Sequence, residues 1–173
     1  YAVLAGSVPP EANSDVYELI LEKLSGKGIK CIVDTTGKFL LGTLKYKPFL
    51  VKPNHIELGE ILNTFVDTEE KAVESAEKLK QMGAQNVLVS RGKDGAVLLT
   101  ENGRVLKTYN LNKKPVNCTG CGDSMVAGFI AGYIKSEDYN YALKFGTACG
   151  NATAFSSELA TKSEIETVFK DMF

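Results

Sequence analysis

Short apolar runs alternate with segments of helical periodicity along most of this chain, and this alternation limits its fold more than any other feature. The apolar runs predict strands at 1–6, 29–34, 49–51 and 86–90, and a hairpin of 96–100 with 105–109. Helical periodicity predicts helices near 16–24, 39–44, 56–62, 68–82, 120–133, 141–155 and from 163 onward. Strands that alternate with helices are typical of a parallel sheet, so we expect an α/β fold.

Local signals place the ends of several elements. Asp15 with Glu18 predicts a capping box at the start of the first helix, and Gly83 predicts the end of the helix at 68–82. The chain opens at Tyr1 on what looks like a strand already in progress, which predicts that an N-terminal part is absent.

Ligands of open α/β sheets bind beyond the carboxyl ends of the strands, so polar residues there are the first candidates for function. Ser7 and Asp34 fit either a substrate contact or a turn cap. The whole set of polar residues expected at these ends is Ser7, Asp34, Asn54, Glu57 and Ser90.

Charge and composition argue against some classes of function. The 173 residues include 20 Lys and Arg against 21 Asp and Glu, which gives a net charge of −1. Such a chain lacks the long-range attraction to phosphate backbones or anionic lipid that basic nucleic-acid and membrane-surface proteins use. Since no apolar run approaches the roughly 18 residues that span a bilayer, we expect a soluble, cytoplasmic protein without nucleic-acid or membrane partners.

Cys118 and Cys121 form a C-x-x-C pair, which fits a redox motif, half of a zinc site or a chance pair in a Gly-rich loop. A zinc site would need two further ligands, but His55 is the only His of the sequence, and Cys31 and Cys149 stand apart. The sequence therefore favours the chance pair, with reduced thiols.

The most informative stretch runs from Asn117 to Phe129, where a loop with two glycines leads into a helix with Asp123 in its first turn. Glycines let backbone N–H groups approach a phosphate closely, and a helix N-terminus adds about half a positive charge. Asp123 could there accept a proton from a hydroxyl group that attacks a phosphoryl group. An Asp that only complements the helix dipole fits the spacing equally well.

Five ordered segments, this stretch among them, resemble the PfkB sugar kinases of the ribokinase-like superfamily. The other four lie at 6–9, 34–37, 48–58 and 89–96, in the order of that family's C-terminal portion. The greatest similarity is to bacterial 1-phosphofructokinases, followed by tagatose-6-phosphate kinases. The resemblance implies a ribokinase-like three-layer αβα fold with a mainly parallel central sheet, in which residues 1–173 are the C-terminal portion of a single kinase domain.

The resemblance also implies a reaction, the transfer of the γ-phosphoryl group of ATP to the 6-hydroxyl of fructose 1-phosphate, which gives fructose 1,6-bisphosphate and ADP. Asp123 would be the catalytic base, and Gly120, Cys121 and Gly122 would form the anion hole for the transferring group. A tagatose-6-phosphate kinase and a catalytically silent nucleotide-binding fragment are the alternatives.

Further residues match the family's cofactor motifs. Asn54 and Glu57 match an N-x-x-E motif linked to Mg²⁺ and its waters, although an ordinary helix cap also explains them. Asn151, in the Ala-rich helix, is a candidate for a nucleotide contact. The residues that match the ATP-binding turn, for which a plain hairpin turn is the alternative, are Ser90, Gly92, Lys93 and Gly95.

Two departures from the family pattern concern the cysteines, since the family usually has Ser or Thr at Cys118 and Ala at Cys121. A thiol beside a helix N-terminus is expected to have a lowered pKa, so we predict sensitivity to thiol reagents that ATP protects against. The family's N-terminal Gly-Gly-Asn signature, its small β lid and its cationic substrate-binding residues are absent from these 173 residues. The free chain would then expose an apolar edge, and the family's use of the lid allows a homodimer of the complete protein.

Overall fold

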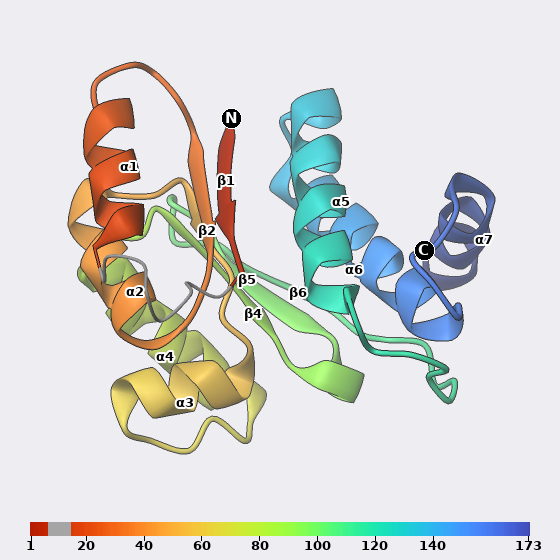
Figure 1. Cartoon of the computed structure of the whole chain (residues 1–173). Helices are drawn as coiled ribbons and strands as arrows, with labels where there is room; N and C mark the ends of the chain where they lie inside the picture. Colours follow the sequence, from red (N-terminus) through yellow and green to blue (C-terminus); the bar gives the residue numbers. More distant parts are fainter. Residues whose placement is uncertain (7–14) are drawn as a thin grey trace. The chain divides into compact units, whose positions relative to one another are not determined.

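The computed structural model describes residues 1–6 and 15–173, and it shows the expected alternation of strands and helices (Figure 1). The strands are β1 (Ala2–Ala5), β2 (Cys31–Asp34), β3 (Leu50–Val51), β4 (Asn86–Ser90), β5 (Ala96–Leu99) and β6 (Val105–Thr108). The α-helices are α1 (Val16–Leu24), α2 (Gly37–Thr43), α3 (His55–Leu62), α4 (Glu69–Gln81), α5 (Cys121–Ser136), α6 (Tyr139–Phe155) and α7 (Lys162–Met172). Two 3₁₀ helices complete the set, η1 (Leu44–Tyr46) and η2 (Gly92–Asp94).

The six strands form one sheet in the order β1-β2-β3-β4-β5-β6. Strands β1 to β4 pair in parallel, and their register places Val33 opposite both Leu4 and Val51. An isolated parallel bridge between Asn54 and Ser90 extends the pairing of β3 with β4 toward the carboxyl ends. The expected α/β class with a mainly parallel sheet is thus confirmed.

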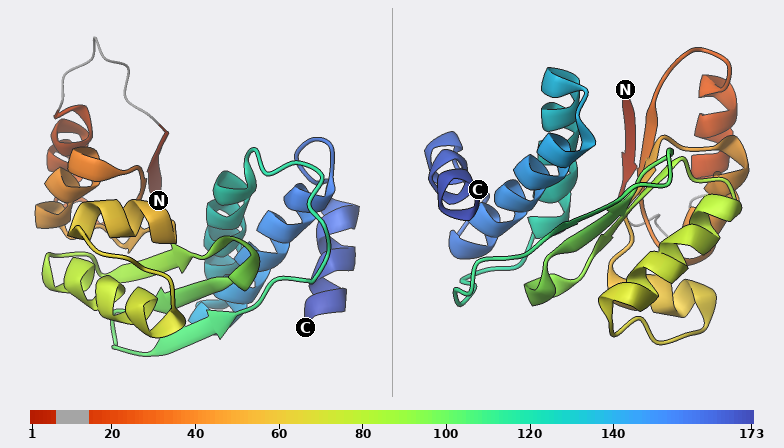
Figure 2. Two further views of the ribbon diagram at one scale, coloured as in Figure 1. Left: turned by 90° about the horizontal axis from the view of Figure 1, so that it is seen from below. Right: turned by 180° about the vertical axis from the view of Figure 1, so that it is seen from behind.

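The described residues divide into two compact units, of which the first comprises 1–90 with 97–105. Its helices α1 to α4 lie on one face of strands β1 to β4 (Figures 1 and 2). Val33 and Val51 of the strands and Leu40, Leu58 and Leu79 of the helices are fully buried or nearly so and belong to the core of this unit. This burial explains the helical and strand periodicity of the sequence.

The second unit comprises 91–96 with 106–173, and small residues bring its helices α5 and α6 close together. A Cβ atom at Gly132 would lie 3.0 Å from the Cα of Ala142, and one at Gly146 would lie 2.7 Å from the carbonyl oxygen of Met125. Ala148 and Ala152 of α6 are buried. At α7, Phe169 makes edge contacts with Tyr141 and Phe145 of α6.

Most predicted boundaries agree with the structure within a few residues, but the capping box at Asp15 is wrong. Asp15 precedes α1, yet its side chain makes no capping hydrogen bond. Glu18 instead pairs with Lys45 of η1, with Oε2 2.7 Å from Nζ, because the fold brings this cation within reach. Ser7, the first of the expected strand-end residues, lies outside the described residues.

Within the described part of the chain, no helix combines the length and the apolar character that crossing a membrane requires.

Candidate active site

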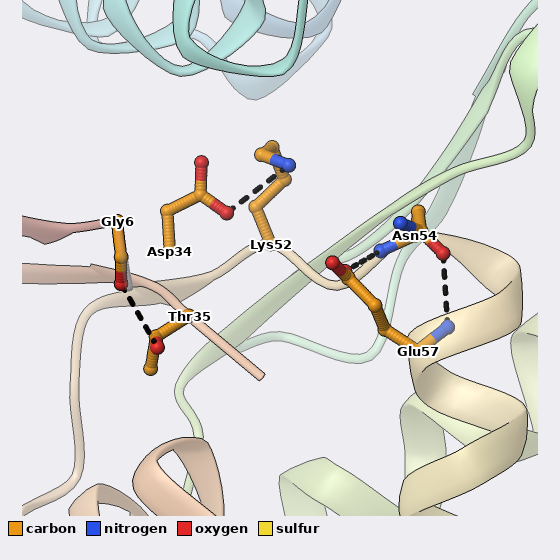
Figure 3. A network of polar contacts seen from close by, with 6 residues as sticks. All are labelled: Gly6, Asp34, Thr35, Lys52, Asn54 and Glu57. Carbon is orange, nitrogen blue, oxygen red and sulfur yellow. Dashed lines mark hydrogen bonds and ion pairs between the residues drawn. The ribbon is translucent and has the colours of Figure 1, made fainter. Parts of the chain in front are cut away.

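Asn54 and Glu57 form a complete capping box at the start of α3 (Figure 3). Oδ1 of Asn54 accepts hydrogen bonds from the backbone N–H groups of Ile56 and Glu57, both at 2.9 Å. Oε2 of Glu57 accepts the N–H of Asn54 at 2.7 Å. The helix-cap interpretation of the N-x-x-E motif is therefore confirmed. Oε1 of Glu57 takes no part in this cap.

Ser90 lies beside this capping box, at the carboxyl end of β4. Its N–H donates to the carbonyl of Pro53 at 3.2 Å, and Ser90 forms the parallel bridge with Asn54. The structure therefore brings together three of the predicted residues, Asn54, Glu57 and Ser90, within the first unit.

An ion pair between Asp34 and Lys52 lies at the carboxyl ends of β2 and β3 (Figure 3). Oδ1 of Asp34 and Nζ of Lys52 are 3.1 Å apart, and the side chains are only 14% and 7% exposed. Lys52 precedes the capping box by two residues, and its N–H continues the sheet by donating to Val33 O at 3.2 Å. The pair lies at the edge where sheets of this class bind ligands, and its two charges offset each other.

The turn after β4 is closed by its own backbone. Arg91 N–H donates to Gly95 O at 2.8 Å, and Gly95 N–H donates to Gly92 O at 3.3 Å around the 3₁₀ helix η2. Gly95 has a φ of 85°, and a Cβ atom there would overlap the carbonyl of Thr108. The position therefore requires glycine, and Lys93 between the two glycines is exposed.

A chain of amide side chains connects this turn to α6 in the second unit. Nδ2 of Asn110 donates to Gly92 O at 2.6 Å, and Nδ2 of Asn151 donates to Asn110 Oδ1 at 2.7 Å. Asn151 also donates to Thr147 O at 2.9 Å and accepts from Leu111 N–H at 3.2 Å. Asn151 is 4% exposed, and its main role in this structure is to hold the turn at Gly92 in place through these hydrogen bonds.

The predicted anion hole lies at the N-terminus of α5. Gly120, the N-cap, has a φ of 77°, and Asp123 is exposed in the first turn. The first N–H groups of a helix have no acceptor within the helix, and the dipole there favours negative charge. A Cβ atom at Gly150 of α6 would lie 3.2 Å from the carbonyl of Cys121, so α6 closely supports this loop.

A hydroxyl contact and backbone contacts hold the same loop against α6. Oγ of Ser124 and Oγ1 of Thr153 are 2.9 Å apart. The N–H groups of Val116 and Asn117 both donate to Ala154 O, at 2.7 and 3.2 Å. The first turn of α5 is therefore preorganised, as a site that stabilises a transferring anion requires.

The expected lowering of the Cys121 pKa is wrong. Burial, with a smaller contribution from the charge of Cys118, raises the pKa of the Cys121 thiol. The half-buried sulfur lies 3.6 Å from the carbonyl oxygen of Asn117, which also disfavours a thiolate. Desolvation therefore outweighs the helix N-terminus at this position.

Sequence reasoning missed two residues of these clusters. Lys52 stands in the run Phe49-Leu-Val-Lys52-Pro, where it resembles a polar strand end, and only its buried partner Asp34 distinguishes it. Asn110 lies in an irregular segment after the hairpin, 41 positions before Asn151 in the chain, and no sequence signal links the two.

Known proteins resemble this chain in sequence. Residues 1–166 match the pfkB family of carbohydrate kinases. The chain is 41% identical over 171 residues to the 1-phosphofructokinase of Bacillus subtilis, and the match covers 98% of this chain and 56% of that protein. It is 31% identical over 176 residues to a tagatose-6-phosphate kinase of Staphylococcus epidermidis, covering 99% and 56%. The chain thus spans about half the length of these relatives.

Solved structures show the same fold. Phosphofructokinase-2 of Escherichia coli in complex with substrates and products matches with a TM-score of 0.88 and 26% identity, over 98% of this chain and 56% of that one. Ribokinase of Arabidopsis thaliana with ribose and ATP matches with a TM-score of 0.80 and 18% identity, over 93% and 54%. The fold is therefore ribokinase-like, and the chain belongs to the pfkB family of carbohydrate kinases.

Proposed function

We propose that this chain is the C-terminal portion of a kinase domain that transfers the γ-phosphoryl group of ATP to the 6-hydroxyl of fructose 1-phosphate. The products are fructose 1,6-bisphosphate and ADP. The observation that carries the proposal is the N-terminus of α5, where an exposed carboxylate follows a glycine turn in a left-handed conformation. The identity of 41% to a 1-phosphofructokinase supports the choice of sugar phosphate.

Asp123 is the proposed catalytic base. Its carboxylate accepts the proton of the attacking hydroxyl group, while the backbone N–H groups of Gly120 and Gly122 hold the transferring phosphoryl group. The N–H of Cys121 joins them when it exchanges its long hydrogen bond of 3.4 Å to Cys118 O for one to that group. A loop already supported by α6 needs little reorganisation when charge develops on that group. Phosphoryl transfer depends on such positioning and charge stabilisation more than on covalent chemistry by the protein.

ATP is the proposed phosphoryl donor, and the turn after β4 is its proposed phosphate site. Ser90 contributes a hydroxyl group, Gly92 and Gly95 allow close backbone approach, and Lys93 contributes an exposed cation. Asn151 supports this site through Asn110, with a nucleotide contact as an additional proposed role.

Mg²⁺ is the proposed cofactor, and the residues present fit it. Glu57 keeps one carboxylate oxygen outside the capping box, which suits an ion that retains several of its waters, and Asn54 orients that carboxylate. When bound with ATP, the ion offsets the negative charge of the phosphates. The ion pair of Lys52 with Asp34 lies at the same edge and has no net charge of its own.

The test is replacement of Asp123 by Asn, with Asp171→Asn, an exposed carboxylate on α7, as the matched control. We expect Asp123→Asn to lower kcat with fructose 1-phosphate by about 10²–10⁴-fold, the usual contribution of a general base. MgATP affinity should be preserved in both variants. Normal turnover by Asp123→Asn would refute the assigned role. Absence of turnover in the parent protein with intact MgATP affinity would favour the silent nucleotide-binding fragment.

The relative named tagatose-6-phosphate kinase supports a second candidate substrate. Initial rates with fructose 1-phosphate and with tagatose 6-phosphate, at equal concentrations, separate the two. The higher kcat/KM identifies the substrate, because this ratio measures discrimination between competing substrates.

A further inference from the structure

Cys118 and Cys121 occupy the two ends of a tight turn directly before α5. Cys121 N–H donates to Cys118 O at 3.4 Å, and Gly120, the third residue of the turn, has φ 77° and ψ 0°. These are the values of a type II turn, whose first and fourth Cα atoms lie less than about 7 Å apart. Disulfides join Cα atoms about 4.4–6.8 Å apart. The backbone therefore holds the two cysteines at a separation that a disulfide can bridge.

The turn itself is held in place before the bond forms. Nδ2 of Asn117 donates to Ser157 O at 3.1 Å, and Thr119 N–H donates to Asn117 Oδ1 at 2.9 Å. The N–H groups of Val116 and Asn117, just before the turn, both donate to Ala154 O. A supported turn keeps the two cysteines close in the folded state.

The two thiols differ in accessibility. Cys118 is exposed, whereas Cys121 is half-buried with its sulfur 3.6 Å from the carbonyl of Asn117. Cys31 and Cys149 are buried. An oxidant in solution therefore reaches Cys118 first, and Cys121 is the thiol placed to respond.

We propose that Cys118 and Cys121 are an oxidation site at which a peroxide forms an intramolecular disulfide across the Gly120 turn. The Cys118 sulfur attacks a peroxide oxygen, the O–O bond breaks, and Cys118 sulfenic acid and one water form. The Cys121 sulfur then attacks the sulfenic sulfur, the S–S bond forms, and the hydroxyl group leaves as a second water. Two thiols lose two electrons and two protons in all, and hydrogen peroxide is reduced to two waters.

The disulfide acts on the loop to which the proposed function assigns phosphoryl binding, so this consequence rests on that function. The Cys121 sulfur must leave the Asn117 carbonyl, and Cys118 must rotate from solvent across the turn. Displacement of a catalytic group by about 1 Å can lower a rate about 10²-fold. We therefore expect the oxidised protein to lose about 10²-fold in turnover and to recover it on reduction.

Peptide mapping tests the site without any activity measurement. The protein is treated with equimolar hydrogen peroxide, its remaining thiols are alkylated, and it is digested with trypsin without reduction. Peptide 114–135 contains Cys118 and Cys121 but neither of the other cysteines. We expect this peptide to lose two hydrogen atoms in mass and to gain no alkyl group, reversibly with dithiothreitol. Two alkylated thiols in this peptide after peroxide treatment, or a disulfide to Cys31 or Cys149, would overturn the inference.

Cys118→Ser provides the matched control, because it removes the exposed thiol and retains Cys31, Cys121 and Cys149. We expect this variant to form no disulfide and to keep its turnover after peroxide treatment. If the parent protein forms the disulfide with unchanged turnover, the regulatory consequence is wrong. If it turns over no sugar phosphate even when reduced, the proposed function fails, while the mapping still decides whether the disulfide site exists.

Discussion

The ion pair of Asp34 and Lys52 leads to a sharp prediction about stability. Lys52→Met removes the ammonium group, retains most of the side-chain volume, and leaves a carboxylate that is 14% exposed without its cation. At 3.1 Å and an effective dielectric constant of about 20, the direct attraction is about 5 kcal/mol, offset by the loss of hydration of both groups. Removing one partner of such a pair typically lowers the free energy of unfolding by about 3–5 kcal/mol.

Urea unfolding followed by circular dichroism measures this loss, since the chain contains no Trp for fluorescence. With a slope of about 2 kcal/mol per molar urea, the midpoint should fall by about 1.5–2.5 M. The matched control is Lys71→Met, which removes an ion pair of 2.7 Å with Asp67 on the surface, at 46% and 65% exposure. The control should shift the midpoint far less, because solvent screens the exposed pair.

The single variant Asp34→Asn and the double variant Asp34→Asn/Lys52→Met complete the cycle. We expect the double variant to be more stable than Lys52→Met alone, because the buried negative charge that Lys52 offset is gone as well. Equal shifts of the urea midpoint for Lys52→Met and Lys71→Met would refute the view that burial makes the Asp34–Lys52 pair important for stability. Strict additivity of the free-energy changes in the cycle would refute it as well.

Three further predictions concern other parts of the chain. Gly103→Ala should lower the free energy of unfolding by roughly 1–3 kcal/mol through backbone strain alone. Gly95→Ala should lower it by more, because of these two positions only Gly95 also lacks space for a Cβ atom. Denaturant titration of both variants measures the difference. Burial raises the pKa of Cys149 to about 11, so iodoacetamide at pH 8 should label it in urea-unfolded but not in folded protein, as mass spectrometry can show. Hydrogen bonds from Thr161 lower the pKa of Glu164. The cap therefore stabilises α7 fully above about pH 5, and this stabilisation is lost as the pH falls through the lowered pKa. A pH titration of the helix content of the parent protein and of Thr161→Val measures this loss.

The sequence predicted the site best where a motif lies within a few neighbouring residues. Asn54 and Glu57 are three positions apart, and that spacing alone places both in one helix turn, so the cap could be foreseen. The turn at Gly120 and the start of α5 were predictable for the same reason. The roles in magnesium binding and phosphoryl transfer stay predictions, since a helix cap or a first-turn acid needs no ligand.

Prediction failed where a distant partner competes with a local one. Glu18 was expected to cap its own helix with Asp15, but η1 brings Lys45 to it and the pair replaces the box. The helix N-terminus predicts a lowered pKa for Cys121, whereas burial of the thiol raises that pKa. The position of Cys121 in the sequence indicates the effect of the helix dipole on its pKa, but it does not indicate how far the fold desolvates the thiol.

The amino-acid sequence by itself determined the alternation of strands and helices, the parallel sheet and the glycine turn before α5, because periodicity and short-range backbone preferences depend on near neighbours. Only the tertiary structure decided that Lys52 is paired with Asp34 and that Asn151 reaches the turn at Gly92 through Asn110. It also decided that Cys121 is half-buried beside an exposed Cys118. These properties depend on burial and on partners far apart in the chain, which are settled only when the helices and strands pack.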